Sequence, residues 1–583
     1  MLRPAQVVWQ NGKPYSTDYD DIYFSMDGPS EVERVFINPT NFDRLVRTNL
    51  LTTVVELGFG TGLNFCVTVE RLLKLGGNNL HFLSFEQHPL SYKDHERIQK
   101  TIAKEIPFYA ELLDQLPPML PGWHRRSFLN GRVSLSLYSG EVLTGLKEIT
   151  ERQKTSVDIC FLDGFDPRKN PAMWTEEVFT ELAKNLSRNS QASTFSAAGH
   201  VRRKLEKIGF KVERISQLPI KRESLIANFR GKILKKTFTP PKEIRILGAG
   251  IAGSTIAQHL AQQGLKVDIT DPAGIARGAS RIKTSLLHGR LIGDQTSNAD
   301  FRVGAYHYSK DYLKKFKGFK KTGILQITGP NMSLEKMKRI QDKYNGSGEW
   351  LQLINEKRFK ALSQTKINCP QALWFPDGGV VDLPALCAEL LDHPNITFEN
   401  RLGNNLKSNN VVIASGHEKP ANYPLAPLET YSIHGQIDSI HTPLSPAIPI
   451  VGNGYIIPID KNHCVVGATY EYQALPTKQA SNQNIDRHKV LLGTKDLQII
   501  DSVRATRCVS SDRVPIIGAL TDQIWVSIAH GSLGTSSAPL GASMIASQIL
   551  GWIPPTSPEV ETTTHPNRFE KRQARRGLLR PPN

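Results

Sequence analysis

Two glycine-rich turns constrain the fold of this chain more than any other feature of its sequence. The first lies in TVVELGFGTGLNF (residues 53–65) and the second in EIRILGAGIAGSTIAQHLAQQG (residues 243–264). Each turn follows an apolar, strand-like run and precedes a helix-like stretch. This order of elements opens an α/β domain with a mainly parallel sheet. The sequence therefore predicts two α/β domains in one polypeptide.

The boundary between these domains is marked by a basic, proline-containing segment. NFRGKILKKTFTPPKE (residues 228–243) contains Pro240 and Pro241, which interrupt regular helix or central strand. We expect a first domain over residues 1–235, a linker over 236–243 and a second domain over 244–555. Residues 556–583 are rich in Pro, Thr and Arg, and we expect them to form a basic, mobile tail.

The charge and the cysteines limit the class of protein. Lys and Arg number 72 against 55 Asp and Glu, a formal net charge of +17, which favours a polyanionic partner such as nucleic acid or an anionic membrane. The sequence has no signal peptide core and no run of about 18 apolar residues, so we expect a soluble, cytosolic protein. The 6 scattered cysteines form no CxxC pair, which argues against a zinc site or a disulfide framework.

The first glycine-rich turn indicates a nucleoside ligand. A strand-like run ends at Glu56, and Gly58, Gly60 and Gly62 follow it in a GxGxG pattern, which is neither the GxGxxG of dinucleotide folds nor a P-loop. The next strand-like run, HFLSFE, ends in Glu86, whose carboxylate can accept both hydroxyls of a ribose. S-adenosylmethionine, which is bulky and free of phosphate, fits these features. The alternative is an ordinary βα turn beside a surface glutamate.

Two further segments of the first half supply candidate site residues. VSLSLYSGEVLTGL ends a third strand-like run in a polar turn, where Glu141 can face an adenine edge. VDICFLDGFDPRKNPAMW gives an apolar strand that ends in Asp163, at the end of the sheet where α/β folds place their chemistry. A carboxylate there can orient an amine and take its proton as a methyl group arrives. The alternative is that Asp163 only caps the next helix.

Several of these segments resemble a known family. ELGFGTGLNF, SFE, LDGFDPRKNPAMW and TFSAAGHVRRKLEKIGF, in this order, resemble the methyltransferase half of the bifunctional tRNA 5-methylaminomethyl-2-thiouridine biosynthesis proteins, as does YDDIYFS (residues 19–25). The resemblance implies a class I, Rossmann-like methyltransferase that acts on an aminomethyl group of the wobble uridine. It also implies that Asp163 is the base and that the cofactor is held by Glu56, Gly58, Gly60, Gly62 and Glu86.

A cluster of basic residues in AGHVRRKL has two interpretations. Arg202, Arg203 and Lys204 can contact phosphate, or they can form a solvated helix face.

The second glycine-rich turn predicts a dinucleotide site. Gly248, Gly250 and Gly253 form GxGxxG between a strand-like run and a helix-like stretch, and Asp271 ends the next strand-like run. In this context a pyrophosphate lies at the helix N-terminus and Asp271 accepts a ribose hydroxyl. The spacing does not separate NAD from FAD.

The rest of the second half resembles FAD-dependent amine oxidases of the D-amino-acid oxidase type. The similar segments are GASRIKTSLLHGRL, WFPDGGVVDLPAL, VVIASGHE, RATRCVSSDRVPIIG and HGSLGTSSAPLGASMIAS. The resemblance implies an FAD-binding Rossmann domain with an α+β substrate domain. It implies that Gly531, Gly534 and Ser537 contact the cofactor and that Arg507 binds a substrate carboxylate, for which a planar guanidinium is suited. The alternative for RATR is a surface turn.

The sequence departs from this second family at several positions. Asp271 stands where glutamate is common, Arg281 and Ile282 replace the usual Gly-Asn after GAS, and Leu533 replaces an arginine. The stretch between Asn395 and Val411 is short, which indicates a trimmed substrate domain.

Together the two resemblances imply a bifunctional tRNA-modifying enzyme that needs no metal and no obligate protein partner. Its FAD-dependent half would remove the carboxymethyl group of 5-carboxymethylaminomethyl-2-thiouridine, and its methyltransferase half would then methylate the aminomethyl product. One alternative is an oxidase of free amino acids or secondary amines with a non-catalytic methyltransferase-like domain, and another is a tRNA-binding scaffold with one dead site. In the first interpretation the positive surplus contacts the tRNA backbone through the Arg202–Lys204 cluster, the linker and the tail.

Overall fold

The structure, a computed structural model, divides into two compact units. It describes residues 2–10, 12–24, 27–219, 221–344, 349–365, 367–401, 409–420, 422–494 and 497–577. Unit 1 comprises Met1–Pro240 and Ser547–Pro555, and unit 2 comprises Pro241–Ala546 and Thr556–Asn583. The sequence did not predict that residues 547–555 join the first unit. Within the described ranges, no helix is both long and apolar enough to cross a membrane.

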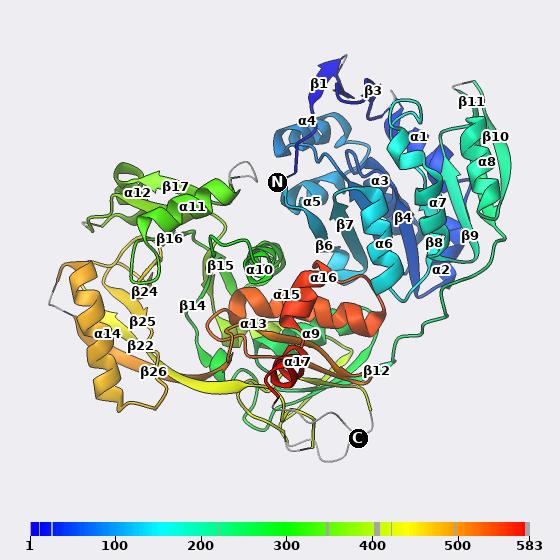
Figure 1. Ribbon diagram of the computed structural model, residues 1–583. Helices are drawn as coiled ribbons and strands as arrows, with labels where there is room; N and C mark the ends of the chain where they lie inside the picture. The colour runs from blue at the N-terminus through cyan, green and yellow to red at the C-terminus, as the bar shows by residue number, and fades with distance from the viewer. Residues whose placement is uncertain are drawn as a thin grey trace. The chain divides into compact units, whose positions relative to one another are not determined.

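Unit 1 is built on one eight-stranded sheet (Figure 1). Its order is β10-β11-β9-β8-β4-β5-β7-β6, and the five strands from β9 to β7 are parallel. The strands are β4 (Leu51–Glu56), β5 (Asn79–Glu86), β6 (Gly122–Phe128), β7 (Val133–Ser139), β8 (Val157–Phe161), β9 (Leu186–Thr194), β10 (Phe210–Gln217) and β11 (Lys221–Phe229). A small sheet of β1 (Val7–Gln10), β2 (Lys13–Ser16) and β3 (Asp21–Ile22) precedes it.

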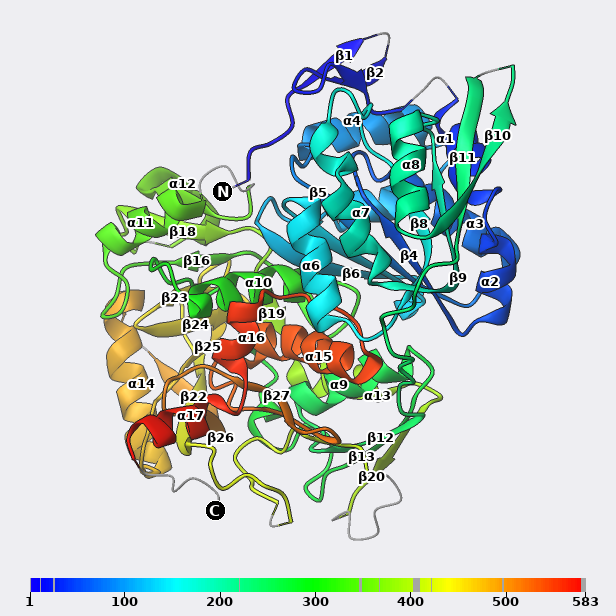
Figure 2. The same cartoon turned by 45° about the vertical axis from the view of Figure 1, so that its right-hand side comes forward.

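Both faces of this sheet are buried, because successive side chains of a strand point to opposite faces. In β4, Val54 packs into the apolar cluster on one face and Val55 into the cluster on the other. The first cluster includes residues of α2 (Phe42–Thr48), α3 (Leu63–Leu75), α4 (Tyr92–Ile102) and α5 (Tyr109–Asp114). The second includes residues of α6 (Val142–Arg152), α7 (Glu176–Ala183) and α8 (Gly199–Lys207), which are seen together in Figure 2.

Residues 547–555 are part of the core of unit 1. Ile553 is fully buried in the second cluster, and the carbonyl of Gly551 accepts hydrogen bonds from the backbone N–H groups of Lys154 and Thr155. The indole of Trp552 stacks on the buried imidazole of His81, with 4.4 Å between ring centroids. A segment that lies between the two parts of unit 2 in the sequence therefore completes the first unit.

Unit 2 contains a six-stranded sheet that carries the second glycine-rich turn. Its order is β20-β13-β12-β21-β28-β27, and all neighbours are parallel except β27 and β28. The strands are β12 (Glu243–Leu247), β13 (Lys266–Thr270), β20 (Ile396–Glu399), β21 (Val411–Ile413), β27 (Ile516–Thr521) and β28 (Ile524–Ile528). Helices α9 (Ile251–Ala261), α13 (Leu383–Leu391) and α15 (Gly534–Leu550) lie near this sheet (Figure 1).

Two further sheets of unit 2 account for the expected α+β part. One is formed by β14 (Ser285–Leu287), β19 (Gly379–Val381) and β15 (Phe319–Lys321). The other has the order β17 (Gln352–Asn355), β18 (Gln371–Phe375), β16 (Ile324–Gln326), β23 (Ile450–Gly452), β24 (Gly454–Pro458), β25 (His463–Gly467), β22 (Thr430–His441) and β26 (Gln498–Ser510). The helices are α10 (Ser297–Leu313), α11 (Leu334–Tyr344), α12 (Glu356–Ser363) and α14 (Thr477–Leu492). Residues 402–408 of the stretch that was expected to be trimmed lie outside the described residues.

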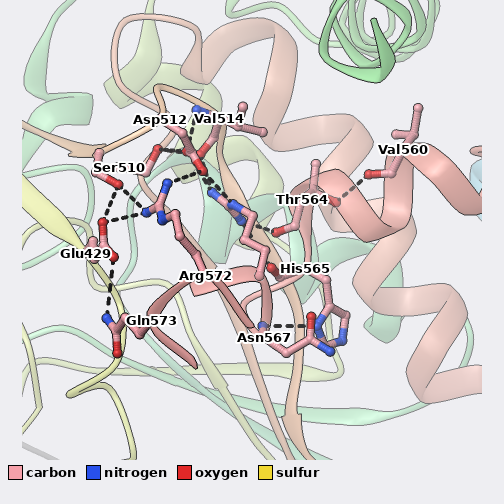
Figure 3. A network of polar contacts seen from close by, with 12 residues as sticks. Glu429, Ser510, Asp512, Val514, Val560, Thr564, His565, Asn567, Arg572 and Gln573 are labelled. Carbon is pink, nitrogen blue, oxygen red and sulfur yellow. Dashed lines mark hydrogen bonds and ion pairs between the residues drawn. The ribbon is translucent and has the colours of Figure 1, made fainter. Parts of the chain in front are cut away.

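The expectation of a mobile tail is wrong for residues 558–575. They form α16 (Pro558–Thr564) and α17 (Arg568–Arg575), and Phe569 is fully buried in a cluster with Val411 and Ile528. Figure 3 shows polar contacts that fasten this segment to residues 429 and 510–514. Composition predicted mobility because the segment is basic, but two of its arginines bind carboxylates of unit 2.

Candidate active sites

The predicted residues of unit 1 lie at the carboxyl end of its parallel strands. Glu56 ends β4, Glu86 ends β5, and Asp163 comes two residues after β8. Strand β4 pairs with β5 on one side and with β8 on the other, so the chain reverses its direction of winding at β4. Ligands of open α/β sheets bind outside the strand ends at such a point. The structure thus brings together the three carboxylates that the sequence singled out.

Glu56 is fully buried beneath the glycine turn. Its Oε2 accepts a hydrogen bond of 2.6 Å from the Ser84 hydroxyl, and its Oε1 is buried without a hydrogen-bond partner among the described residues. Burial raises the pKa of Glu56 well above its usual range, and the nearby Asp163 and Glu86 raise it further. An unsatisfied acceptor in this position fits a ligand that brings a cation or a hydrogen-bond donor, as the ammonium group of S-adenosylmethionine does.

Glu86 supports the glycine turn directly. Its two oxygens accept hydrogen bonds from the backbone N–H groups of Gly60 (2.8 Å) and His88 (2.7 Å). Burial nevertheless raises the pKa of Glu86. Each carboxylate oxygen keeps a second lone pair, so this arrangement leaves room for ribose hydroxyls. Glu141 is exposed at the start of α6, two residues after β7, whose Ser139 is paired with Glu86.

The three glycines of the first turn lie between Glu56 and α3. Gly62 has φ +74°, and a Cβ there would come within 2.7 Å of Leu112. A Cβ at Gly58 would lie 3.2 Å from the Asp163 carbonyl oxygen, so the turn and the β8 loop approach each other closely. Gly60 has φ +51° and donates its N–H to Glu86. These glycines are required by the backbone path as well as by a ligand.

Asp163 is held in place by two hydrogen bonds. Its Oδ2 accepts from Asn64 Nδ2 at 2.7 Å, and its Oδ1 accepts from the Gly164 backbone N–H at 2.8 Å. Asn64 lies in the first turn of α3, directly after the glycine turn. Sequence reasoning missed Asn64, although its position next to the GxGxG pattern was the available signal.

Three half-buried aromatic residues lie beside Asp163. Phe165 stacks on Tyr19, with 4.6 Å between ring centroids, and meets Tyr23 edge to face at 5.2 Å. The Asp166 backbone N–H donates to Asp21 Oδ2, which ties the N-terminal segment to the β8 loop. Residues 19–25 resemble the methyltransferase family, but sequence reasoning assigned no role to the three rings.

The second site is a cavity of about 630 Å³ in unit 2. Of the predicted residues, it is lined by Gly248, Gly250, Asp271, Arg507, Gly531 and Gly534. Of the positions that depart from the family, Asp271, Ile282 and Leu533 line the cavity and Arg281 does not.

Two predicted cofactor residues do not reach this cavity. A Cβ at Gly253 would lie 1.9 Å from the Gly248 carbonyl oxygen, so this glycine allows α9 to pack against the turn. The Ser537 hydroxyl is buried, donates to the Leu533 carbonyl at 2.9 Å and is 2.9 Å from His530 Nδ1. Both residues support the lining from behind.

The glycine turn of unit 2 fits the pyrophosphate and ribose of a dinucleotide. Gly248 has φ +106°, and a Cβ there would come within 2.5 Å of the Ala414 carbonyl oxygen. Gly250 immediately precedes α9, so the N-terminus of this helix opens into the cavity. The Asp271 carboxylate accepts from the backbone N–H groups of Ala249 and Ala273, both at 2.9 Å. A backbone this close to a ligand leaves no room for side chains, and FAD fits this cradle.

Arg507 lies on β26 at the other part of the cavity. Its Nη1 donates to the Thr469 carbonyl oxygen at 3.4 Å, and a Cβ at Gly435 would lie 2.7 Å from the same nitrogen. Glycine at position 435 therefore provides the space that the guanidinium occupies. Asp512, five residues after Arg507, binds Arg568 of the C-terminal segment instead of the site. Arg290 and Tyr455 also line the cavity, and sequence reasoning did not single them out.

Two family models match the chain, one in each of its halves. Residues 103–230 match the family of S-adenosyl-L-methionine-dependent methyltransferases, and residues 243–548 match the family of FAD dependent oxidoreductases. The chain is 28% identical to the tRNA 5-methylaminomethyl-2-thiouridine biosynthesis bifunctional protein MnmC of Marinobacter nauticus, over 94% of each chain. It is also 28% identical to the protein of the same name from Pseudomonas entomophila, over 99% of each chain.

Among solved structures, glycine oxidase from Geobacillus kaustophilus aligns with a TM-score of 0.48 and 17% identity, over 57% of this chain and 99% of that one. The oxidoreductase match extends over more than half of the sequence and includes the whole glycine turn of unit 2. The chain therefore belongs to the family of FAD dependent oxidoreductases, and it carries an S-adenosyl-L-methionine-dependent methyltransferase in the same polypeptide.

Proposed function

We propose that this chain is a bifunctional enzyme that modifies the wobble uridine of tRNA. The observation that carries the proposal is the similarity, over nearly the full length of both partners, to proteins named for 5-methylaminomethyl-2-thiouridine biosynthesis. Each unit offers a candidate site for its half of this activity, a carboxylate cluster at the strand ends of unit 1 and a cavity of about 630 Å³ in unit 2.

Unit 2 would act first, on 5-carboxymethylaminomethyl-2-thiouridine. FAD supplies the oxidation by accepting a hydride from the methylene carbon between the amine and the carboxylate. The resulting C=N bond is hydrolysed, which leaves the 5-aminomethyl group on the uridine and releases glyoxylate. Arg507 would hold the carboxylate of the substrate, and its place between Gly435 and the Thr469 carbonyl fixes its guanidinium for that role.

Unit 1 would then methylate the 5-aminomethyl group. The amine must be neutral to attack the methyl group of S-adenosylmethionine, so a base is needed beside it. Asp163 is suited to accept the proton, because its carboxylate is oriented by Asn64 and by the Gly164 N–H at the switch point of the sheet. The adjacent Phe165, Tyr19 and Tyr23 offer ring surface on which an unstacked base can lie.

The proposed contact surface for tRNA is smaller than the positive surplus indicates. In the Arg202–Lys204 cluster, Arg202 is paired with Glu206 and Lys204 donates to the Trp174 carbonyl. At the end of the first domain, just before the linker, burial lowers the pKa of Lys235 to about 8, and its ammonium group donates to Asn185 Oδ1. Other cations, including Arg203, Lys232 and Lys236, remain for phosphate contacts.

An oxidase of free amino acids is the second candidate, and it is less well supported. That function would leave the Glu56, Asn64 and Asp163 constellation of unit 1 without a purpose, although its polar contacts are intact. It would also leave unexplained the similarity of unit 1 to the bifunctional relatives.

Nucleoside mass analysis of tRNA tests the proposal. Cells that lack the gene are expected to accumulate 5-carboxymethylaminomethyl-2-thiouridine and to contain no 5-methylaminomethyl-2-thiouridine, and the intact gene should restore it. Normal 5-methylaminomethyl-2-thiouridine in the deletion strain would overturn the proposal. Flavin reduction by free glycine or sarcosine, with none by the modified tRNA, would favour the free amino-acid oxidase.

A further inference from the structure

The unit 2 cavity contains a second arginine that the proposed chemistry does not yet use. Arg290 follows β14 in the sequence and lines the same cavity as Arg507. The ionisable groups that act on Arg290 include Arg507 and the hydroxyl of Tyr455, and the same two arginines act on Tyr455. We call the part of the cavity formed by Arg290, Gly435, Tyr455 and Arg507 the arginine end.

Arg290 lines the cavity and is accessible from it. Burial lowers its pKa, and the positive charge of Arg507 lowers it further. Its side chain is nevertheless exposed to water. Because Arg290 lines the cavity, a ligand that enters the cavity can replace water at its guanidinium.

The backbone around Arg290 is fixed in an unusual conformation. Its φ is +40°, in the left-handed region that residues with side chains seldom adopt. The Arg290 carbonyl oxygen accepts a hydrogen bond of 3.0 Å from Arg302 Nη1. The Nη1 atom of Arg290 donates to the Ser532 hydroxyl. Ser532 follows Gly531 in the loop that lines the cavity before α15. Such strain persists only where neighbouring groups impose it, and it is found most often at functional sites.

The arginine end has a strong excess of positive charge. The acidic residues in the lining of the cavity are Asp271 and Glu418. The Asp271 oxygens accept hydrogen bonds from backbone N–H groups at the glycine turn. Within the described residues, neither of these carboxylates is among the groups that shift the pKa of Arg290. Burial and Arg290 lower the pKa of His288 to about 3, so this neighbour is neutral.

Two guanidinium groups that line one cavity with little opposing charge favour the binding of an anion. The two positive charges repel each other across the cavity, and an anion between them relieves this repulsion. One arginine satisfies a carboxylate along one edge only, and each carboxylate oxygen has a further lone pair for a second donor.

We propose that Arg290 and Arg507 together bind the carboxylate of the amine substrate, and that Arg290 makes the cavity selective for amines that carry an N-linked CH₂COO⁻ group. The identity of that amine rests on the proposed function. The binding of the carboxylate is a property of the cavity alone, so it can be measured without tRNA.

The test uses the FAD-loaded full chain and a ligand that cannot be oxidised as an amine. Glycolate supplies the carboxylate, and glycolamide is its neutral counterpart of the same size. Binding is followed by the change in flavin absorbance on titration. Wild-type protein is expected to bind glycolate at least about ten-fold more tightly than glycolamide, since charge-assisted hydrogen bonds are about twice as strong as neutral ones.

Arg290→Met is expected to weaken glycolate binding by about 10-fold to 100-fold and to leave glycolamide binding unchanged, because only the charged ligand loses a partner. Arg290→Lys keeps the charge without the fork and should recover part of the loss. Arg358→Met, on the exposed face of α12, removes the same charge away from the cavity and should leave both affinities as in the wild type.

Two results would overturn the inference. Wild-type affinity for glycolate in a folded, FAD-loaded Arg290→Met variant would show that Arg290 does not bind the carboxylate. A variant that releases FAD more readily but binds glycolate normally when loaded would assign Arg290 to the cofactor. If Arg290→Met does not fold, Ser532→Ala removes the hydroxyl that holds Arg290 and should weaken glycolate binding several-fold, and unchanged binding would again contradict the inference.

The outcome is independent of the proposed function. Glycolate binding that depends on both arginines, in a protein that leaves modified tRNA unchanged, would refute the tRNA activity and retain the carboxylate site. The opposite pair of results would retain the activity and refute the role of Arg290.

Discussion

The guanidinium of Arg125 donates a hydrogen bond of 2.5 Å to the carbonyl oxygen of Ile553, although the two residues are 428 positions apart. Arg125 is buried, and it also donates to the hydroxyls of Ser136 and Ser547. Its side chain lies over the Trp552 ring, 5.2 Å from the centroid. Residues 547–555 thus supply both polar partners and apolar surface to unit 1, so its stability depends on a segment more than 400 positions away from Arg125 in the sequence.

Replacement of Trp552 by Ala tests this dependence. The change removes the ring that covers His81, and truncation of a buried aromatic side chain costs about 3–5 kcal/mol. We expect S-adenosylmethionine binding to be lost on heating at a lower temperature than in the wild type, while flavin release is little changed. Binding calorimetry and flavin fluorescence measure the two events separately.

The control for this experiment is Leu50→Ala, because Leu50 is 87% exposed and its loss should change neither transition. Equal destabilisation of S-adenosylmethionine binding and flavin retention by Trp552→Ala would contradict a role limited to unit 1.

The C-terminal segment is expected to stabilise unit 2 through Arg568. Its guanidinium donates to both oxygens of Asp512, at 3.0 and 3.1 Å, and to the Val514 carbonyl (Figure 3 shows the surrounding network). Arg568→Met leaves a half-buried carboxylate without its main partner and should destabilise unit 2 by about 1–3 kcal/mol. Denaturant unfolding followed by flavin fluorescence measures this loss.

The stabilisation of unit 2 by the Arg568–Asp512 ion pair is expected to decrease at low pH. Burial opposes ionisation of Asp512, but Arg568 outweighs it and lowers the pKa of Asp512 below its usual value. The stabilisation is therefore complete above the unfolded pKa of about 3.9 and declines as the pH falls through the lower folded value. Asp512→Asn in the Arg568→Met background should recover part of the stability at neutral pH, and no recovery would exclude the unpaired carboxylate as the cause.

Local sequence patterns predicted the parts of both sites that the backbone itself determines. A tight turn after a parallel strand requires glycine, so Gly62 and Gly248 were visible, and carboxylates at strand ends revealed Glu56 and Asp163. Each of these signals lies within a few residues of a strand end.

Other features depend on contacts that no local pattern contains. The segment at Ile553 joins unit 1 because its side chain and carbonyl find partners more than 400 positions earlier. The sequence did not single out Arg290, because one arginine in a loop forms no periodic pattern. The proposed role of Arg290 depends on its proximity to Arg507, which lies on a distant strand. The basic composition of the last helix predicted mobility because it does not reveal that Asp512 and Glu429 bind Arg568 and Arg572.

Separate substitutions in the two units should stop the modification at different stages. Asp163→Asn keeps the hydrogen-bonding shape but removes the base, so tRNA should accumulate the 5-aminomethyl form. Arg507→Met removes the carboxylate partner, so the 5-carboxymethylaminomethyl form should accumulate. A reduction in turnover of at least about 100-fold is expected for each, which is the lower range for loss of a general base. Nucleoside mass analysis distinguishes the two forms, and the reverse assignment would contradict the roles of the units.

Glu56→Gln is expected to make unit 1 more stable while it weakens the binding of S-adenosylmethionine. Because burial raises the pKa of Glu56, the folded protein holds a proton on this side chain at pH values where the unfolded chain has released it. The folded state then binds more protons than the unfolded state, so this side chain lowers the stability as the pH rises from about 4.5 toward the folded pKa. Glutamine removes that penalty, so the variant should be more stable than the wild type at neutral pH.

The same variant should bind S-adenosylmethionine about ten-fold more weakly, since it replaces a charged acceptor by a neutral one. In the wild type, a cationic ligand next to Glu56 favours the ionised carboxylate, so binding should release a proton and the affinity should rise with pH. Titration calorimetry in two buffers of different ionisation enthalpy measures the released proton, which should be absent for Glu56→Gln. If the two proteins release the same number of protons, Glu56 is not the group that ionises when the cationic ligand binds.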